Sequence, residues 1–335
     1  MIFAITGANG FLGVHIIHHL LSEGHEVKGI VRPGASMSEF ENVKVFYDLE
    51  EEAYGRLEWC SCTLYDMVGL EYIFTRVDYV MHLAGVISYL QRDFDYMLEV
   101  NQQYTANVVN ACLSSDVQKL LYCSSIAAVT KTTNGDIITE DIEWNNEVDH
   151  SNYGYTKHLG EFEIWRGREE GLKTVAINPG IILGYGDWNK GSNKLFKNAA
   201  KQFPFYSRGI TGWVGVTDVA RIAFKLCMDN AIEGRFILVS ENKSFQEVSR
   251  LMATAFEVKE PWVEVKGVLY NLVYGFVSLK EALGLRGMLS KETVRASVSV
   301  NRFDNSKVSS KLEYSFENIE EVVNRAVMGY KKSPL

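Results

Sequence analysis

The chain has 335 residues, of which 47% are apolar and 23% charged, and its 34 basic and 42 acidic side chains give a net charge of −8. This length predicts about two folded units, and only 5 prolines with no biased tract exclude collagen-like, mucin-like and largely disordered proteins. The acidic balance argues against nucleic acid as a partner. The longest apolar stretch, from Gly267 to Leu279, is too short for an integral membrane span. The scattered cysteines and the absence of a secretory leader predict a cytoplasmic protein.

The first 180 residues predict strands and helices in regular alternation. An apolar run at 2–6 leads into a glycine turn, an amphipathic helix from Phe11 and a strand at 27–31. Further strands are expected at 57–60, 79–83, 119–124 and 174–177, and further helices at 68–74, 94–113 and 153–168. This alternation is typical of the α/β class, with a doubly wound parallel sheet of the Rossmann type.

The rhythm loosens after residue 180. We expect a loop at 184–191, strands at 213–216 and 236–239, and helices at 194–202, 218–228, 244–256 and 267–284. The predicted domains are therefore a dinucleotide-binding Rossmann domain of residues 1–180 plus 213–240, and a smaller substrate-binding domain of residues 181–212 plus 241–335.

Gly7, Gly10 and Gly13 follow the first strand and open the first helix. In this setting the first glycine permits a tight turn, the second lets the backbone approach a pyrophosphate, and the third lets helix and strand pack closely. Backbone N–H groups at the start of the helix then bind phosphate. The turn therefore predicts a dinucleotide site.

Arg32 ends the second strand, where an acidic residue that binds the ribose hydroxyls of NAD is often found. A guanidinium suits the 2′-phosphate of NADP. The sequence therefore favours NADP over NAD as cofactor, with NAD as the alternative.

Tyr153 and Lys157 are four residues apart at the start of a predicted helix and share one face. A tyrosine acid has a free pKa of about 10, and a nearby ammonium lowers it. Ser124 and Ser125 end the preceding strand, and only one of them can face the cofactor because successive strand residues point to opposite faces. These residues predict a site for proton transfer to a carbonyl oxygen.

The chain resembles the extended short-chain dehydrogenases/reductases, within the NAD-dependent epimerase/dehydratase superfamily. The resemblance covers nearly the whole chain and lies in residues 6–13, 82–85, Asn101, Ser124-Ser125, Tyr153 with Lys157, and the segments 178–180 and 216–220. It implies that the catalytic residues are Ser125, Tyr153, Lys157 and the helix residue Asn101. The residues that it implies for cofactor binding are Gly7, Gly10, Phe11, Leu12, Gly13, Arg32, Thr63, Leu64, Leu83, Ala84, Gly85, Tyr153, Lys157, Pro179, Gly180 and Ile182. Thr63 stands where the family usually has an adenine-binding Asp, and Gly154 is given no role.

Within this family the chain resembles the dihydroflavonol-reductase-like branch, which includes 3β-hydroxysteroid-dehydrogenase relatives. Three residues depart from the sugar-nucleotide enzymes. Ile126 follows Ser125 where 4,6-dehydratases carry an Asp-Glu pair, so the acid and base for elimination are missing. Ile181 stands in place of a substrate-binding Asn of the epimerases, and Thr211 in place of their Arg that binds the substrate pyrophosphate. We therefore expect an NADP-dependent oxidoreductase that reduces a carbonyl on a largely apolar small molecule. The alternatives are an NAD-dependent sugar-nucleotide epimerase or dehydratase, and a non-catalytic NAD(P)-binding sensor.

Some features leave alternatives open. His15 and His19 share a helix face but have no third ligand, so no metal site is predicted. Cys60 and Cys62 are expected to be buried as small apolar residues. The apolar stripe of residues 267–284 fits a core helix, a lid over an apolar substrate or a membrane-surface helix, and aromatic residues at 203–206 and Trp213 could line the same pocket. A homodimer is an open expectation from the family resemblance.

Overall fold

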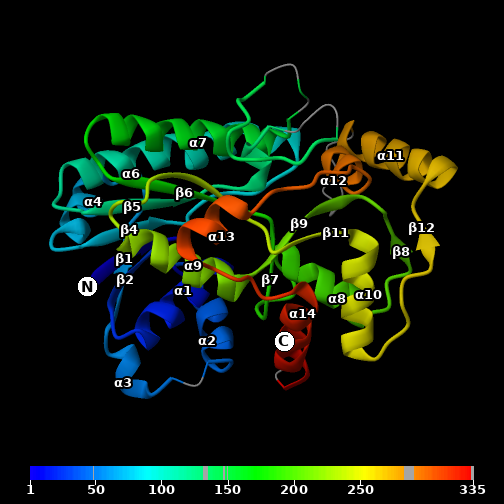
Figure 1. The fold of residues 1–335 in the computed structure, drawn as a ribbon, viewed down its shortest axis with the longest axis horizontal. Coiled ribbons are helices and arrows are strands. Elements are labelled where there is room, and N and C mark those ends of the chain that lie inside the picture. Colours follow the sequence, from blue (N-terminus) through cyan, green and yellow to red (C-terminus); the bar gives the residue numbers. More distant parts are fainter. Residues whose placement is uncertain (48, 131–134, 146–147, 149, 283–289, 333–335) are drawn as a thin grey trace.

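The computed structural model describes residues 1–47, 49–130, 135–145, 148, 150–282 and 290–332. Seven parallel strands form its central sheet in the order β10-β6-β5-β4-β1-β2-β3 (Figure 1). Their bounds are β1 (Ile2–Thr6), β2 (Glu26–Val31), β3 (Leu57–Ser61), β4 (Tyr79–His82), β5 (Lys119–Cys123), β6 (Thr174–Pro179) and β10 (Gly234–Leu238). The strand order reverses between β1 and β4, and in such sheets the ligand crevice lies beyond the carboxyl ends of the strands at that reversal.

Helices cover both faces of the central sheet (Figure 1). One face carries α4 (Met67–Phe74), α6 (Tyr104–Leu113) and α7 (Asn152–Glu169), and the other carries α1 (Phe11–Ser22) and α9 (Val216–Met228). Alternate side chains of each strand enter different cores: Phe3 and Ile5 of β1 pack with α1 and α9, whereas Ala4 packs with the helices of the first face. A sheet buried on both faces explains the continuous apolar runs in the sequence.

The chain builds a second, smaller region beyond β6. It contains a three-stranded sheet of order β11-β9-β7 and a two-stranded sheet of β12 and β8. The strands are β7 (Ile181–Leu183), β8 (Phe205–Tyr206), β9 (Ile210–Gly215), β11 (Glu241–Ser244) and β12 (Val263–Glu264). The remaining helices are α2 (Ser38–Lys44), α3 (Glu51–Tyr54), α5 (Phe94–Leu98), α8 (Lys194–Ala200), α10 (Phe245–Phe256), α11 (Gly267–Ala282), α12 (Lys291–Ala296), α13 (Ser306–Leu312) and α14 (Ile319–Lys332). β10 returns to the central sheet beside β6, and the domain limits expected from the sequence stay a prediction.

The helix expected over 94–113 is divided in the structure. A π-helical segment, Glu99–Gln103, separates α5 from α6. Such segments insert an extra residue into the helical turn and are frequent at functional sites. Asn101 lies within this segment and is fully buried.

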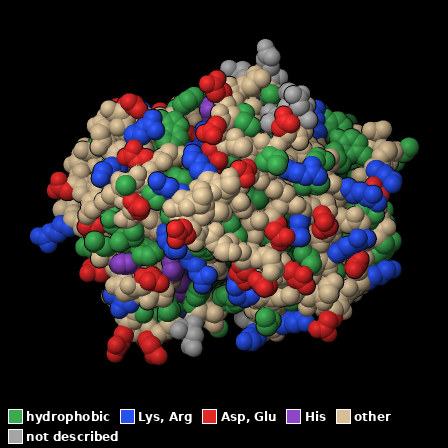
Figure 2. All heavy atoms as spheres, in the orientation of Figure 1, with side chains coloured by type: hydrophobic (Ala, Val, Ile, Leu, Met, Phe, Trp, Pro, Cys, Tyr) green, Lys and Arg blue, Asp and Glu red, His purple; other side chains and the backbone are tan. Residues whose placement is uncertain are grey.

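The interpretation of residues 267–284 as a core helix is wrong, because most apolar side chains on the predicted face are exposed to solvent. Leu272 is 65% exposed and Phe276 68% exposed, and Val268 and Leu279 are exposed as well, whereas Val277 on the opposite side is buried. Apolar side chains gather over this helix at the upper right of the molecule (Figure 2). Leu283, the last residue of the predicted stripe, lies outside the described residues. Among the helices of the described ranges, none has the length and apolar character needed to cross a membrane.

Two smaller expectations also change. Trp213 is fully buried and donates its indole N–H to the carbonyl oxygen of Lys243, so it packs in the core and lines no open pocket. Cys62 is buried as expected, but Cys60 is only partly buried because β3 is an edge strand of the sheet.

Candidate active site

The glycine turn lies at the carboxyl end of β1. Gly7 has φ of +71°, a conformation that side chains rarely adopt, and a Cβ atom there would lie 2.8 Å from the backbone nitrogen of Ala84. A Cβ atom at Gly13 would lie 2.8 Å from the carbonyl oxygen of Ala8, so only glycine lets α1 approach β1 this closely. At Gly10, by contrast, a Cβ atom would meet only the carbonyl oxygen of Gly7, at 3.2 Å.

This geometry fits a dinucleotide. Gly10 is exposed and is the N-cap of α1, without a side-chain cap. The first amides of a helix lack partners within the helix, so those of Phe11 and Leu12 are suited to bind a pyrophosphate at this end. Ala84 follows β4 and packs directly on the turn, which brings the segment Leu83–Gly85 to the same crevice.

Asn101 joins the cofactor segment to the catalytic helix. Its Nδ2 donates to the carbonyl oxygen of Val86 and to Thr156 Oγ1, both at 3.0 Å, and its Oδ1 accepts from the backbone N–H of Val86 at 2.9 Å. A Cβ atom at Gly85 would lie 3.2 Å from Asn101 Oδ1 and 3.6 Å from Lys157 Nζ. The structure therefore brings Gly85, Asn101 and Lys157 together.

Ser125 and Tyr153 lie on segments that pack closely. Ser125 follows β5, and its Oγ accepts from the backbone N–H of Ala127 at 3.1 Å, whereas the preceding Ser124 is buried. Ser151 caps α7 by accepting from the backbone N–H of Gly154 at 3.0 Å. A Cβ atom at Gly154 would collide with the carbonyl oxygen of Ala127, so Gly154 has a structural role that sequence reasoning missed.

Burial governs the protonation of this site. The lowering of the Tyr153 pKa expected from a nearby ammonium is wrong, because burial raises this pKa and only a hydrogen bond from Ser125 opposes the rise. Burial also lowers the pKa of Lys157 to about 8, against opposing effects of Cys123 and Glu161. The Lys157 ammonium lies 4.1 Å from the centre of the Tyr122 ring, a cation–π arrangement. At neutral pH this environment favours a protonated Tyr153, which is the form that an acid needs.

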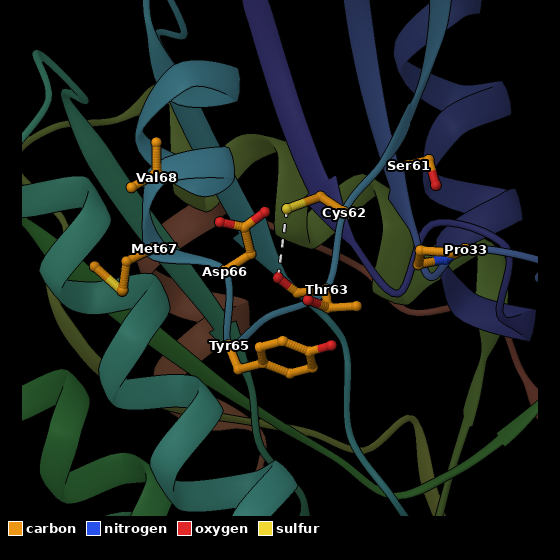
Figure 3. A pocket seen from close by; sticks show the side chains of 8 residues that line it. All are labelled: Pro33, Ser61, Cys62, Thr63, Tyr65, Asp66, Met67 and Val68. Carbon is orange, nitrogen blue, oxygen red and sulfur yellow. Dashed lines mark hydrogen bonds between the residues drawn. The ribbon is translucent and has the colours of Figure 1, made fainter.

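A cavity of about 470 Å³ lies between the ends of β2 and β3 and the start of α4 (Figure 3). Thr63 lines this cavity, whereas the side chain of Leu64 is buried in the adjoining core, and their roles in cofactor binding stay predictions. Sequence reasoning missed the other lining residues, which are Pro33, Ser61, Cys62, Tyr65, Asp66, Met67 and Val68. Asp66 is the N-cap of α4, where its carboxylate accepts from the backbone N–H of Gly69. An Asp directly before a helical segment is a typical N-cap signal, so the sequence could have indicated this residue.

Arg32 directly precedes Pro33, which lines this cavity. Arg32 is exposed, and its guanidinium makes no hydrogen bond or ion pair with the residues that the structure describes, whereas its carbonyl oxygen accepts from the backbone N–H of Ala35 at 3.0 Å. In the loop that follows, Ser36 Oγ donates to the hydroxyl of Ser38, the first residue of α2, at 3.0 Å. Asn9 Nδ2 donates to the carbonyl oxygen of Ser36 at 2.9 Å and ties this loop to the glycine turn.

The other end of the crevice is formed where β6 ends and β7 begins. Pro179 is buried, and Gly180 and Ile182 are partly buried. Gly180 packs on the backbone of Gly212, and Ile182 holds the Ser192 hydroxyl through its carbonyl oxygen at 2.6 Å. Tyr89, which sequence reasoning missed, places its ring 6.2 Å from that of Tyr153.

The histidines of α1 have structural partners. His15 Nδ1 lies 2.6 Å from the Tyr47 hydroxyl and its Nε2 2.9 Å from the carbonyl oxygen of Tyr185, so both ring nitrogens are engaged. Burial lowers the pKa of His15 to about 3. Among the described residues, no group of three or more His, Cys, Asp or Glu side chains is arranged to hold a metal ion.

The fold and this site define an enzyme of the Rossmann type that uses a nicotinamide dinucleotide. The model of the NAD dependent epimerase/dehydratase family matches residues 3–233, and the chain belongs to this family. The chain is thus an NAD(P)-dependent extended short-chain dehydrogenase/reductase, as the sequence motifs implied.

Individual relatives agree with this assignment. The chain is 23% identical to a putative dihydroflavonol 4-reductase of Synechocystis sp. over 97% of this chain and 93% of that protein. It is 26% identical to cinnamoyl-CoA reductase 1 of Petunia hybrida over 70% of this chain and 72% of that protein. The structure of UDP-glucuronic acid 4-epimerase from Bacillus cereus in complex with NAD is similar in fold, with a TM-score of 0.74, 17% identity and coverage of 99% and 97%.

Proposed function

We propose that this protein is an NADP-dependent reductase of a carbonyl on a largely apolar small molecule. The observation that carries the proposal is the placement of Tyr153 and Lys157, both buried on one face of α7, beside Ser125. Reductases among the relatives support the direction of the reaction.

Each residue has a role that follows from its surroundings. Bound NADPH supplies the hydride to the carbonyl carbon. Tyr153 gives its proton to the developing alkoxide, and the raised pKa of its buried hydroxyl keeps that proton in place before reaction. Ser125 holds the carbonyl oxygen by a hydrogen bond. Lys157 holds the nicotinamide ribose through its ammonium group.

Arg32 supports NADP as the cofactor. The Arg32 guanidinium, which has no partner among the described residues, and the hydroxyls of Ser36 and Ser38, which follow it closely in the chain, offer several donors to a 2′-phosphate. The cavity bounded by Pro33 and Tyr65 has the size and partly apolar lining to receive the adenine (Figure 3).

Other residues support an apolar substrate. Ile126 opens the short turn after Ser125, where elimination of water would need an acidic group. Ile181 and Thr211 lie on the neighbouring strands β7 and β9 and supply no cation for a sugar-nucleotide pyrophosphate. A cytoplasmic location and a homodimer stay predictions from the sequence.

The test is reduction of a panel of apolar aldehydes and ketones with NADPH by the wild type and by Tyr153→Phe. We expect turnover by the wild type and a loss of about 100-fold or more in kcat for the variant, because general acid catalysis contributes factors of this order. Near wild-type rates for the variant would refute the role of Tyr153. Conversion of UDP- or dTDP-sugars with tightly bound NAD would favour the epimerase alternative, and cofactor binding without any turnover would favour a sensor.

A further inference from the structure

We propose that Glu161 is a positioning residue that fixes Ser125 through Asn178 and holds Lys157 in its ammonium form. This inference rests on the proposed function, because its effect on turnover needs the Tyr153 and Lys157 chemistry. Glu161 itself does not reach the crevice, since it is fully buried behind the catalytic residues.

Glu161 continues the catalytic face of α7. It lies four residues after Lys157 and eight after Tyr153, and residues at this spacing lie on one side of a helix. All three side chains are buried, with exposures of 8% for Tyr153, 3% for Lys157 and 0% for Glu161. A carboxylate without exposure is rare in a protein unless it is paired.

Its partners come from two strands of the central sheet. Glu161 Oε1 accepts from Asn178 Nδ2 on β6 at 2.7 Å, and Oε2 forms an ion pair with Arg235 on β10. Asn178 Nδ2 also donates to the carbonyl oxygen of Ser125 at 2.9 Å. One carboxylate therefore connects the catalytic helix, two strands and the backbone of the residue that would hold the substrate carbonyl.

The electrostatic part of the inference depends on what surrounds Lys157. The groups that act on it from the packed elements are His82 of β4, Tyr122 and Cys123 of β5, and Glu161 of its own helix. Burial lowers the pKa of His82 to about 3 and raises the pKa of Cys123 to about 11, so both are neutral near pH 7. Of these groups, the ion-paired Glu161 carries the negative charge that favours the ammonium.

The environment of Glu161 includes few other titratable groups. Arg235 faces it from β10, Tyr122 from β5, and His158 lies beside them on α7. Burial and the charge of Arg235 lower the pKa of His158 to about 4, and burial keeps Tyr122 protonated. The local charge therefore stays constant over the pH range in which Lys157 titrates.

The decisive variant is Glu161→Gln, with Glu169→Gln on the exposed end of the same helix as the matched control. We expect the alkaline limb of the kcat/KM profile to move to lower pH by about one unit, because a nearby charge shifts a pKa by one to three units. We also expect kcat at pH 7 to fall about twofold with little change in substrate KM, because a Lys157 pKa that moves from about 8 down by one unit nearly halves the ammonium fraction at that pH. The control is expected to keep the wild-type profile.

A conservative variant separates charge from shape. Glu161→Asp keeps the charge but shortens the reach to Asn178, so we expect a wild-type alkaline limb with a lowered kcat. If Glu161→Gln does not fold, the double variant E161Q/R235Q, which removes both buried charges, tests the positioning role alone, and a wild-type kcat there would overturn that role. An unchanged alkaline limb in folded Glu161→Gln would overturn the electrostatic role, even where the thermal midpoint falls.

NADPH binding provides a readout without turnover. A Lys157 ammonium that donates to ribose hydroxyls makes affinity fall as the pH rises through its pKa, and cofactor fluorescence measures this fall. We expect the fall to begin at lower pH in Glu161→Gln than in the wild type. If the wild type reduces no carbonyl while this shift is present, the proposed function fails and the role of Glu161 stands. If the wild type reduces carbonyls and no shift is present, the proposed function stands and the role of Glu161 in holding the Lys157 ammonium fails.

Discussion

Thr6 Oγ1 lies 2.6 Å from His82 Nδ1, and both side chains are fully buried between neighbouring strands. His82 Nε2 lies 3.0 Å from Thr105 Oγ1, which donates its hydrogen to the carbonyl oxygen of Asn101 at 2.8 Å. Because the threonine hydrogen is used there, His82 Nε2 must donate and Nδ1 must accept from Thr6. This chain of neutral hydrogen bonds joins the strand of the glycine turn to the π-helical segment that carries Asn101.

Replacing His82 by phenylalanine is expected to destabilise the protein. The ring volume is kept, but the hydroxyls of Thr6 and Thr105 lose buried partners, and each unsatisfied group costs about 1–3 kcal/mol. Urea denaturation measures the change, with Thr105→Val as a smaller step along the same chain. An unchanged midpoint for His82→Phe would contradict the hydrogen-bond assignment.

Acid is expected to destabilise the protein through its buried histidines. Burial lowers the pKa of His15 and His82 to about 3, and of His18 and His158 to about 4. In the unfolded chain these groups titrate near 6.5, so below that pH the unfolded state binds more protons and stability is lost as the pH falls. Thermal midpoints measured from pH 7 down to pH 4.5 test this, and we expect a shallower fall for His82→Phe, which lacks one of the four groups.

Much of the central sheet could be predicted because local pattern and tertiary role agree there. Strands buried on both faces appear as apolar runs, and β4, β5 and β6 begin at the expected residues. The stripe of α11 shows the limit of this reasoning. Helical period shows that apolar residues share a face, but it does not show whether another element covers that face.

The site could be predicted in its motifs but not in the contacts that support them. Gly7, Ser125 and Tyr153 stand in patterns that the chemistry itself requires. His82 and Thr6 are 76 residues apart, and Arg235 and Glu161 are 74 apart, so no local pattern relates them. These pairs form only when strands distant in the sequence become neighbours in the sheet.

Arg32→Ala is expected to weaken NADPH binding and to leave NADH binding nearly unchanged. Hydrogen bonds to charged groups contribute about 1.5–3 kcal/mol, which corresponds to roughly 10- to 100-fold in affinity. Isothermal calorimetry with both cofactors measures the ratio, and Arg250→Ala on α10 is the matched control. Tighter binding of NADH by the wild type, or equal losses for both cofactors, would remove the argument for NADP.

Gly154→Ala is expected to lower both kcat and stability. The added Cβ atom would collide with the carbonyl oxygen of Ala127 and lie 3.1 Å from Ser151 Oγ, so α7 must shift away from the Ser125 segment. Gly275→Ala in α11 is the matched control, because a Cβ atom there meets nothing within 4 Å. The control is expected to gain up to about 1 kcal/mol from helix propensity, and a similar gain at Gly154 would contradict the packing argument.

The exposed face of α11 is expected to act on the substrate rather than on the fold. α11 packs on α12, where Arg295 donates to the Tyr274 hydroxyl at 2.8 Å. From α12, Glu292 Oε1 accepts from the backbone N–H of Asn152 at 3.3 Å, directly before Tyr153. Through α12, α11 is therefore linked to the start of α7, which carries Tyr153. A lid over an apolar substrate needs such a connection to the catalytic helix.

The double variant Leu272→Ser/Phe276→Ser tests this lid. We expect the KM for apolar carbonyls to rise several-fold while NADPH affinity and the thermal midpoint stay near wild type, because both side chains are largely exposed. Val277→Ser, at a position only 2% exposed, is the control that should lower the midpoint. A lowered midpoint for the double variant would restore the core-helix interpretation. An unchanged KM together with loss of sedimentation on lipid vesicles would instead assign the face to a membrane surface.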